Sequence, residues 1–268
     1  METEFVFQVK DVSFAYDGTL VAVDKVNMLI QMGERVAILG ANGCGKSTLL
    51  KLLDALYFPT HGMIMAFGEP VTEQAFQDET TQHAFRRRVG FLFQDSDVQL
   101  FSPSVWDEVA FAPLQMGLSR LDVVERVEVA LRTLHIEKLR ERAPHRLSGG
   151  EKKRVALASI LSLDPQVWLL DEPTGDLDPR SAAWLDDFIY EQGEKGHTII
   201  IATHDLELVE SIADRVYLFN EQHQIVAEGA PDQILSDQTL LVACNMLPRH
   251  KHTRETRQRA PTHLEEAN

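Results

Sequence analysis

A short glycine-rich segment at residues 40–47 has the residue types and the spacing needed to bind a polyphosphate. It fits the pattern G-x-x-x-x-G-K-[ST], in which backbone N–H groups surround phosphate oxygens. We expect Lys46 to reach the outer phosphates and the Ser47 hydroxyl to ligate Mg²⁺. The alternative is an ordinary glycine-rich turn, and the other motifs of the chain must decide between the two.

The sequence on either side predicts the strand–loop–helix arrangement that this motif requires. Residues 35–39 indicate a short buried strand, and residues 48–53 indicate a helix. A helix N-terminus placed directly after the loop favours a bound anion.

Two adjacent carboxylates, Asp171 and Glu172, follow a second buried strand at residues 167–170. Carboxylates at the end of an apolar strand are costly unless they are used. We expect Asp171 to hold Mg²⁺ through water and Glu172 to polarise an attacking water molecule.

Two further polar residues end predicted strands. Gln94 follows residues 89–93, and His204 follows the strand at residues 198–202. Open α/β sheets bind ligands at the carboxyl ends of their strands. We therefore expect Gln94 to ligate Mg²⁺ or orient water. A lone histidine is usually structural, but His204 is predicted to point into the site.

Residues 147–151 open a long predicted helix with a serine and two glycines, so this helix N-terminus suits an anion. Ser148 and Glu151 also fit a capping box, and one helix start can both be capped and bind an anion.

Tyr16, at a strand end, is either a platform for a nucleobase or a plain strand tyrosine. Residues 121–134 predict a helix whose core face is formed by Leu121, Val124, Val127, Leu131 and Leu134.

The composition limits the class of protein. The chain has 268 residues, is 44% hydrophobic and carries a formal net charge of −15, which argues against nucleic acid as a partner. Cys44 and Cys244 suggest neither a disulfide framework nor a metal site. No signal peptide and no membrane-spanning run is recognised, so a cytoplasmic protein that reaches a membrane through partners is expected.

Together these motifs and their order resemble the nucleotide-binding subunit of ATP-binding-cassette (ABC) transporters over about residues 5–235. The resemblance implies an α/β phosphate-loop fold with a mixed central sheet and flanking helices, an antiparallel β subdomain and a helical signature subdomain. It implies ATP and Mg²⁺ as ligands, and a head-to-tail dimer, either of two identical subunits or of two different paired ATPases. The dimer is expected on the cytoplasmic face of a membrane, beneath transmembrane coupling and substrate-binding subunits. ATP binding is assigned to Tyr16, Gly40, Ala41, Asn42, Gly43, Cys44, Gly45, Lys46, Ser47 and Thr48, and Mg²⁺ to Ser47, Gln94 and Asp171. Catalysis is assigned to Glu172, His204 and Gln94, the D-loop to Asp176 and Asp178, and contact with the partner's ATP to Leu147, Ser148, Gly149, Gly150 and Glu151.

A narrower resemblance rests on residues 93–103 and 107–111, which look like the ATPase of energy-coupling-factor importers of the cobalt/nickel branch. Its acids and aromatic residues, Asp97, Phe101 and Glu108 among them, are expected to form a docking surface for the membrane partner. Residues 1–235 are predicted to be the ATPase domain, and residues 236–268 a helical or loosely ordered tail with His250, His252 and His263. The alternatives are a vitamin importer of the same type and a soluble ABC ATPase.

Overall fold

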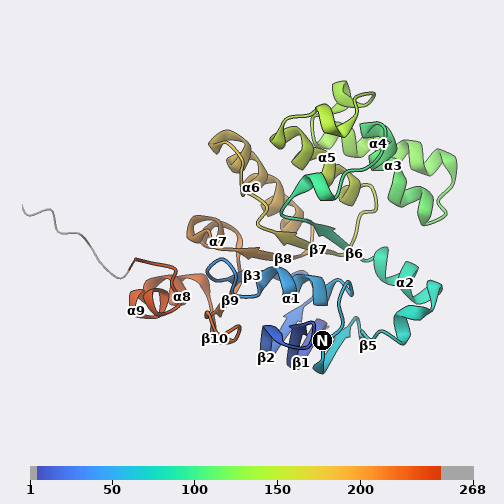
Figure 1. Cartoon of the computed structure of the whole chain (residues 1–268). Coiled ribbons are helices and arrows are strands. Elements are labelled where there is room, and N and C mark those ends of the chain that lie inside the picture. The colour runs from blue at the N-terminus through green and yellow to red at the C-terminus, as the bar shows by residue number, and fades with distance from the viewer. Residues whose placement is uncertain (1–4, 249–268) are drawn as a thin grey trace, which may run out of the picture.

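The computed structural model describes residues 5–248 and contains two β-sheets with helices packed around them (Figure 1). The larger sheet runs through the middle of the molecule, and the smaller antiparallel sheet lies below helix α1. The predicted fold class, a mixed central sheet with an antiparallel β subdomain and a helical region, is confirmed.

The central sheet has six strands in the order β10-β9-β3-β8-β7-β6. They are β3 Arg35–Leu39, β6 Val89–Leu92, β7 Val167–Asp171, β8 Thr198–Thr203, β9 Arg215–Phe219 and β10 Ile225–Gly229. All neighbours pair in parallel except β10, which returns antiparallel to β9. The carboxyl ends of five strands therefore lie along one edge of the sheet.

The smaller sheet has the order β2-β1-β4-β5 and is antiparallel throughout. Its strands are β1 Phe5–Tyr16, β2 Leu20–Gln31, β4 His61–Ala66 and β5 Glu69–Pro70. The hairpin between β1 and β2 turns at Asp17 and Gly18, which both have positive φ, as the Asp-Gly pair predicts.

The helices connect these strands. The α-helices are α1 Lys46–Leu53, α2 Glu79–Arg86, α3 Val105–Gln115, α4 Arg120–Thr133, α5 Gly149–Leu161, α6 Pro179–Glu194, α7 Leu206–Ile212, α8 Pro231–Ser236 and α9 Gln238–Ala243. Single 3₁₀ turns occur at Ala75–Gln77, Ser96–Val98, Glu137–Leu139 and Pro144–Arg146. Figure 1 shows α1 on one side of the central sheet, and α3 to α6 on the other side.

Alternating side chains of the central strands build separate cores on the two faces of the sheet. In β8, Ile200 packs into the core shared with α1 and the antiparallel sheet, whereas Ile199 and Ile201 pack toward α5 and α6. In β7, Leu169 and Trp168 divide in the same way. Because both faces are covered, these strands are apolar along their whole length, which made them recognisable in the sequence.

Two sequence expectations need correction or remain open. In the predicted helix, Val127, Leu131 and Leu134 are buried as expected. Leu121 and Val124 are instead 82% and 39% exposed, and Val123 takes the buried position. Leu121 and Val123 both lie at the start of α4. Val123 packs into the core shared with α3 and α5, and Leu121 does not. At the C-terminal end, α9 packs Leu241 into a third cluster with β3 and β9. The boundary at residue 235 stays a prediction, and the histidines of the tail lie outside the described residues.

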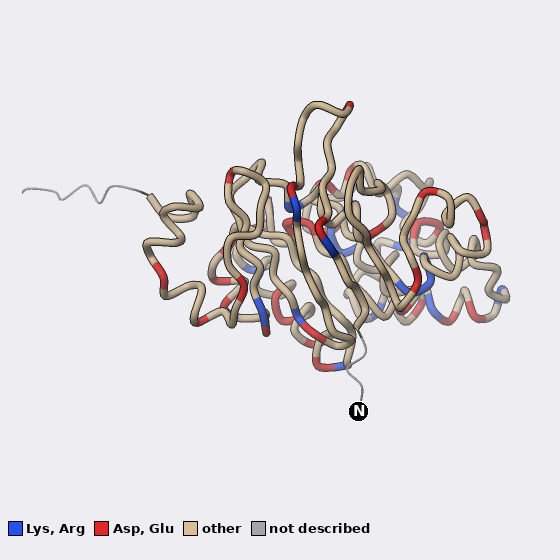
Figure 2. The backbone as a smooth tube through the Cα atoms, turned by 90° about the horizontal axis from the view of Figure 1, so that it is seen from below, with Lys and Arg blue, Asp and Glu red and all other residues tan. Residues whose placement is uncertain are grey.

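Charged residues occur in most parts of the described backbone, with acids and bases interleaved (Figure 2). Among residues 5–248, no helix is long and apolar enough to cross a bilayer.

Candidate functional site

The candidate site residues predicted from the sequence lie at the carboxyl edge of the central sheet. The phosphate loop follows β3, the acids close β7, His204 follows β8 and Gln94 comes just after β6. Because β3, β8, β7 and β6 are adjacent and parallel, their ends meet at one place. A cavity of about 520 Å³ opens there, and its lining includes Tyr16, Gly43, Gly45, Lys46, Ser47, Thr48, Gln94, Glu172 and His223.

The lysine of the phosphate loop, Lys46, is buried and lines the cavity. The Lys46 ammonium group is buried, donates to the backbone carbonyls of Gly40 (2.8 Å) and Ala41 (3.2 Å), and lies 3.4 Å from a carboxylate oxygen of Glu172. Gly45 has φ +111°, and a Cβ there would lie 2.1 Å from the carbonyl oxygen of Ala22. Glycine is therefore required at position 45 both by the backbone conformation and by the close approach of β2.

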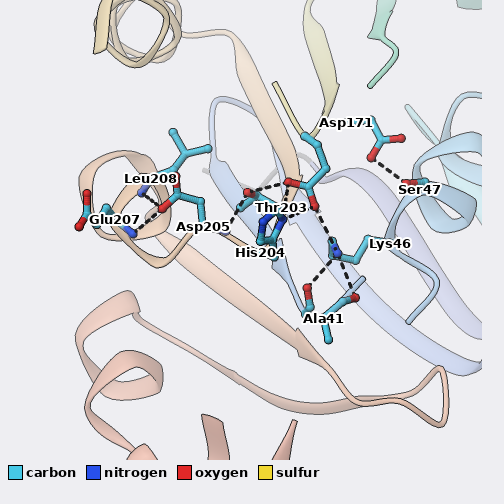
Figure 3. Close-up of polar contacts among 11 residues, drawn as sticks. Ala41, Lys46, Ser47, Asp171, Thr203, His204, Asp205, Glu207 and Leu208 are labelled. Carbon is cyan, nitrogen blue, oxygen red and sulfur yellow. Dashed lines mark hydrogen bonds and ion pairs between the residues drawn. The ribbon is translucent and has the colours of Figure 1, made fainter. Parts of the chain in front are cut away.

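Ser47 and Asp171 face each other across the edge. The Ser47 hydroxyl donates to Asp171 Oδ1 at 2.8 Å (Figure 3). Burial raises the pKa of Asp171, with the Ser47 hydrogen bond opposing this effect. A hydroxyl and a carboxylate are hard oxygen ligands of the kind that Mg²⁺ prefers, and Gln94 lines the same cavity. The donor set present therefore fits Mg²⁺.

Glu172 contacts residues of both the phosphate loop and the end of β8. Its carboxylate is buried, accepts the Thr203 hydroxyl at 3.2 Å, and lies 3.0 Å from His204 Nδ1. Because a carboxylate only accepts hydrogen bonds, Nδ1 of His204 carries the hydrogen. The backbone of Glu172 has φ +42°, a left-handed conformation that is unusual for this residue and is typical of functional turns.

Tyr16 stands at the mouth of the cavity. Its hydroxyl lies 3.0 Å from Thr48 Oγ1, and its ring packs edge-on against Phe14 and Tyr57. Leu20 and Val21, both exposed, line the cavity beside it. Apolar side chains around an aromatic ring suit the face of a nucleobase. This favours the interpretation of Tyr16 as a ring on which a nucleobase stacks.

Residues 147–151 lie at the start of α5 and outside the lining of the phosphate cavity. The predicted capping box is present: the Ser148 side chain caps Glu151 N–H, and the Glu151 carboxylate accepts Ser148 N–H at 2.8 Å. Gly149 lines a second cavity of about 320 Å³ together with Gln94 and Asp176. Asp178 caps α6, where the Ser181 hydroxyl holds the pKa of its carboxyl below the usual range.

Lys153 belongs to this second cavity and was not singled out from the sequence. Lys153 is only 4% exposed, and its ammonium group donates to the backbone carbonyl of Gln94 at 2.8 Å. Burial lowers the pKa of Lys153, and Asp171 and Asp176 oppose that shift. A lysine on the buried face of a predicted helix was the available signal, but its partner is a backbone atom 59 residues away.

The docking surface predicted for residues 95–111 is only partly exposed. Phe101 is 67% exposed and stands edge-on to the exposed Phe111, with ring centroids 4.9 Å apart. Glu108, expected to be a surface acid, is instead 4% exposed and accepts the N–H groups of Phe101 (2.9 Å) and Ser102 (2.7 Å). Glu108 therefore holds the loop that presents Phe101, and that part of the expectation is wrong.

Comparison with known proteins places this site in context. The sequence model of a family described as ABC transporter matches residues 23–175. The nickel import ATP-binding protein NikO of Rhodobacter capsulatus is 49% identical over 245 residues, which cover 90% of this chain and 96% of that protein. The solved structure of CbiO1 from Clostridium perfringens, part of the ABC transporter complex CbiONQ, is 34% identical with a TM-score of 0.77, covering 91% of this chain and 95% of its own. A dimeric ATP-binding cassette bound to ADP and phosphate is 25% identical with a TM-score of 0.75, covering 84% of this chain and 98% of its own.

Proposed function

Because the chain belongs to the ABC transporter family, we propose that it is the ATP-hydrolysing subunit of an energy-coupling-factor importer for nickel or cobalt ions. Family membership makes it an ATP-binding transporter subunit. The importer type rests on the resemblance at residues 93–111, and the metal cargo rests on the similarity to the nickel import protein of Rhodobacter capsulatus.

The arrangement around Glu172 is the observation that carries the chemistry. ATP enters the cavity with its base near Tyr16 and its triphosphate along the loop at residues 40–47, where Lys46 contacts the outer phosphates. Glu172 orients a water molecule toward the γ-phosphorus and accepts its proton as the bond to the leaving ADP breaks. His204, which faces Glu172, holds the carboxylate in place during this step.

Mg²⁺ would be held by Ser47 and Asp171, with Gln94 as a further ligand, and when bound it supplies charge neutralisation at the phosphates. Lys46 must exchange its loop carbonyls and Glu172 for phosphate oxygens when ATP binds. The attraction between Lys46 and Glu172 thus keeps the lysine in the site before the nucleotide arrives.

A second ATPase subunit would complete each site. Ser148 and Gly150 lie at a helix start outside the lining of the phosphate cavity of their own chain, so they are available to the ATP of a partner. A head-to-tail dimer would bring this N-terminus to the γ-phosphate. The solved dimeric cassette described above is consistent with such an assembly.

The membrane partner would dock around the exposed pair of Phe101 and Phe111; we call this pair, with the exposed Val98 and Leu114 near it in sequence, the Phe101 patch. Asp97, next to Val98 in the sequence, contacts Lys152 at 2.5 Å and is largely exposed. A basic, apolar coupling segment of a transmembrane subunit fits this mixture of aromatic and acidic groups. The chain would then sit on the cytoplasmic face of the membrane.

Uptake by the reconstituted importer tests this proposal. We expect vesicles in which the chain and its membrane partners are oriented with the ATPase inside to accumulate nickel or cobalt only when ATP is enclosed in the vesicle. Wild-type importer in vesicles without ATP is the control for leakage. Accumulation of a vitamin with no metal uptake would reject the cargo, and hydrolysis with no membrane partner recovered would reject the importer role.

A further inference from the structure

His223 lines the phosphate cavity although it lies outside every motif discussed above. It sits in the turn between β9 and β10, far along the chain from the phosphate loop. Its Nδ1 lies 3.1 Å from the backbone carbonyl oxygen of Cys44, inside that loop. A carbonyl oxygen only accepts hydrogen bonds, so Nδ1 of His223 is the donor.

The turn that carries His223 is fixed to the rest of the site. Asp24 of β2 donates its N–H to the His223 carbonyl at 2.9 Å, and its carboxylate accepts the Gln224 amide at 2.6 Å. Asn220 Oδ1 accepts the N–H groups of Gln222 and Gln224, both at 3.0 Å. His223 itself has φ +65°, a left-handed conformation that is uncommon for residues other than glycine.

The contact constrains the phosphate loop in a specific direction. In a trans peptide, the carbonyl and the N–H group point to opposite sides. Because the Cys44 carbonyl and the Gly45 N–H belong to the same peptide plane, holding that carbonyl at His223 also fixes the direction of the Gly45 N–H. Gly45 N-caps α1 and lines the cavity, so its N–H group is one of the donors that can meet a phosphate.

We propose that His223 is a positioning residue for the nucleotide site, which holds the phosphate loop in its binding conformation through the Cys44 carbonyl. This inference rests on the nucleotide-binding role proposed above. The β9–β10 turn, which carries none of the motifs named above, would thus hold the phosphate loop in place. The loop is thus restrained on two sides, by β2 at Gly45 and by His223 at Cys44.

Two substitutions separate the hydrogen bond from the backbone strain. Glycine accepts a left-handed φ without a donor, whereas asparagine also tolerates this conformation and places an amide nitrogen where His223 has Nδ1. We expect His223→Gly to weaken the binding of Mg·ATP about fivefold in Kd, and to raise KM with little change in kcat. We expect His223→Asn to restore Kd to within about twofold of wild type.

The experiment measures Kd of Mg·ATP by calorimetry on the full chain, with the melting temperature of the nucleotide-free protein as a fold check. Gln222→Ala, an exposed neighbour in the same turn, is the matched control and should bind as wild type does. Wild-type affinity in His223→Gly, or no difference between the Gly and Asn variants, would overturn the inference. Lys46→Ala distinguishes failure of this inference from failure of the proposed nucleotide site. If Lys46→Ala bound Mg·ATP as tightly as wild type, the nucleotide site itself would be rejected.

Discussion

Glu172 is the residue at which the phosphate loop, β7 and β8 meet. Lys46, Thr203 and His204 all contact its carboxylate: Lys46 comes from the phosphate loop, and Thr203 and His204 come from the end of β8. Such a carboxylate can act only if its neighbours hold it toward the γ-phosphate. Its positive φ is consistent with a backbone bent for that purpose.

Replacing Glu172 with glutamine keeps its shape and removes its basicity. We expect Glu172→Gln to lower the hydrolysis rate on the order of 10²–10⁴-fold, the usual contribution of general-base catalysis. The affinity for ATP should be kept or raised, because a carboxylate near the phosphates and the competing ion pair with Lys46 both disappear. Steady-state phosphate release and ATP titration measure the two effects.

Glu210→Gln is the control for this variant, since Glu210 is an exposed carboxylate on the neighbouring α7. It should hydrolyse ATP as wild type does. Turnover by Glu172→Gln within about tenfold of wild type would show that another group activates the water.

At the residue level, the sequence located the candidates that stand at strand ends. Asp171 ends one apolar run, His204 follows another, and Lys46 closes the loop after a third, so parallel pairing of these runs brings the three residues to one edge. Lys153 and His223 were missed because their partners are backbone carbonyls reached through tertiary packing. Glu108 was misplaced for a related reason: nothing local shows that a loop folds back to place two N–H groups on it.

At the level of elements, an ion pair between the buried Asp54 and the partly exposed Arg86 joins the phosphate-loop helix α1 to α2. Asp54, directly after α1, lies 2.7 Å from the Arg86 guanidinium and is almost fully buried, with Oδ1 lacking a partner among the described residues. Burial raises the pKa of Asp54 to about 6, although Arg86 opposes the shift. In the unfolded chain an aspartate titrates near 3.9.

The sign of the pH effect follows from these values. Between about pH 4 and pH 6 the folded protein binds more protons at Asp54 than the unfolded chain, so the free energy of unfolding rises as the pH falls. At pH 7.5 the ionised carboxylate is unfavourable, by about 3 kcal/mol relative to an unshifted group. We expect Asp54→Asn to be as stable as wild type or more stable at pH 7.5, and to lose this gain below pH 6.

Urea unfolding at pH 7.5 and pH 5 measures the prediction, with Glu79→Gln on exposed α2 surface as the control. If Asp54→Asn instead lost stability by about 3–5 kcal/mol at pH 7.5, the pair with Arg86 would be net stabilising. The element pattern of the chain offered no hint of this pair, because Asp54 and Arg86 both lie at helix ends that usually face solvent.

Element prediction succeeded where burial on both faces dictates the pattern, as in β7 and β8, whose apolar runs are continuous. It failed in α4, where several apolar residues compete for one narrow face. Leu121 and Val124 fit helical spacing as well as Val123 does, and only the position of α3 and α5 selects among them.

At the level of the whole molecule, the Phe101 patch is where a partner would dock. Phe101→Ser should leave the melting temperature nearly unchanged, since its ring is largely exposed and touches mainly Phe111. Truncating an aromatic anchor of an interface costs about 2 kcal/mol, which is about thirtyfold in Kd for the membrane partner. Met63→Ser on β4, also exposed, is the control in the same pull-down. Equal recovery of the partner by both variants would place the docking surface elsewhere.

The proposed head-to-tail dimer divides each ATP site between two chains, and mixed dimers test this division. Lys46→Ala removes the phosphate ligand of a chain's own cavity. Ser148→Asp keeps a good N-cap for α5 but sets a negative charge where the partner's phosphates would lie. Ser148→Asn is the uncharged control for the same position, and it should retain more activity than Ser148→Asp.

In a dimer of one Lys46→Ala chain and one Ser148→Asp chain, both defects fall into the same composite site and the other site stays intact. Half of randomly formed dimers are mixed, and each keeps one site of two, so an equal mixture should recover roughly a quarter of wild-type hydrolysis. Each variant alone has two damaged sites and should be nearly inactive. ATP binding gives an independent readout, because an intact composite site traps one nucleotide per mixed dimer even if hydrolysis needs both sites. A verified mixture that neither binds nor hydrolyses ATP would show that Ser148 acts on the nucleotide of its own chain.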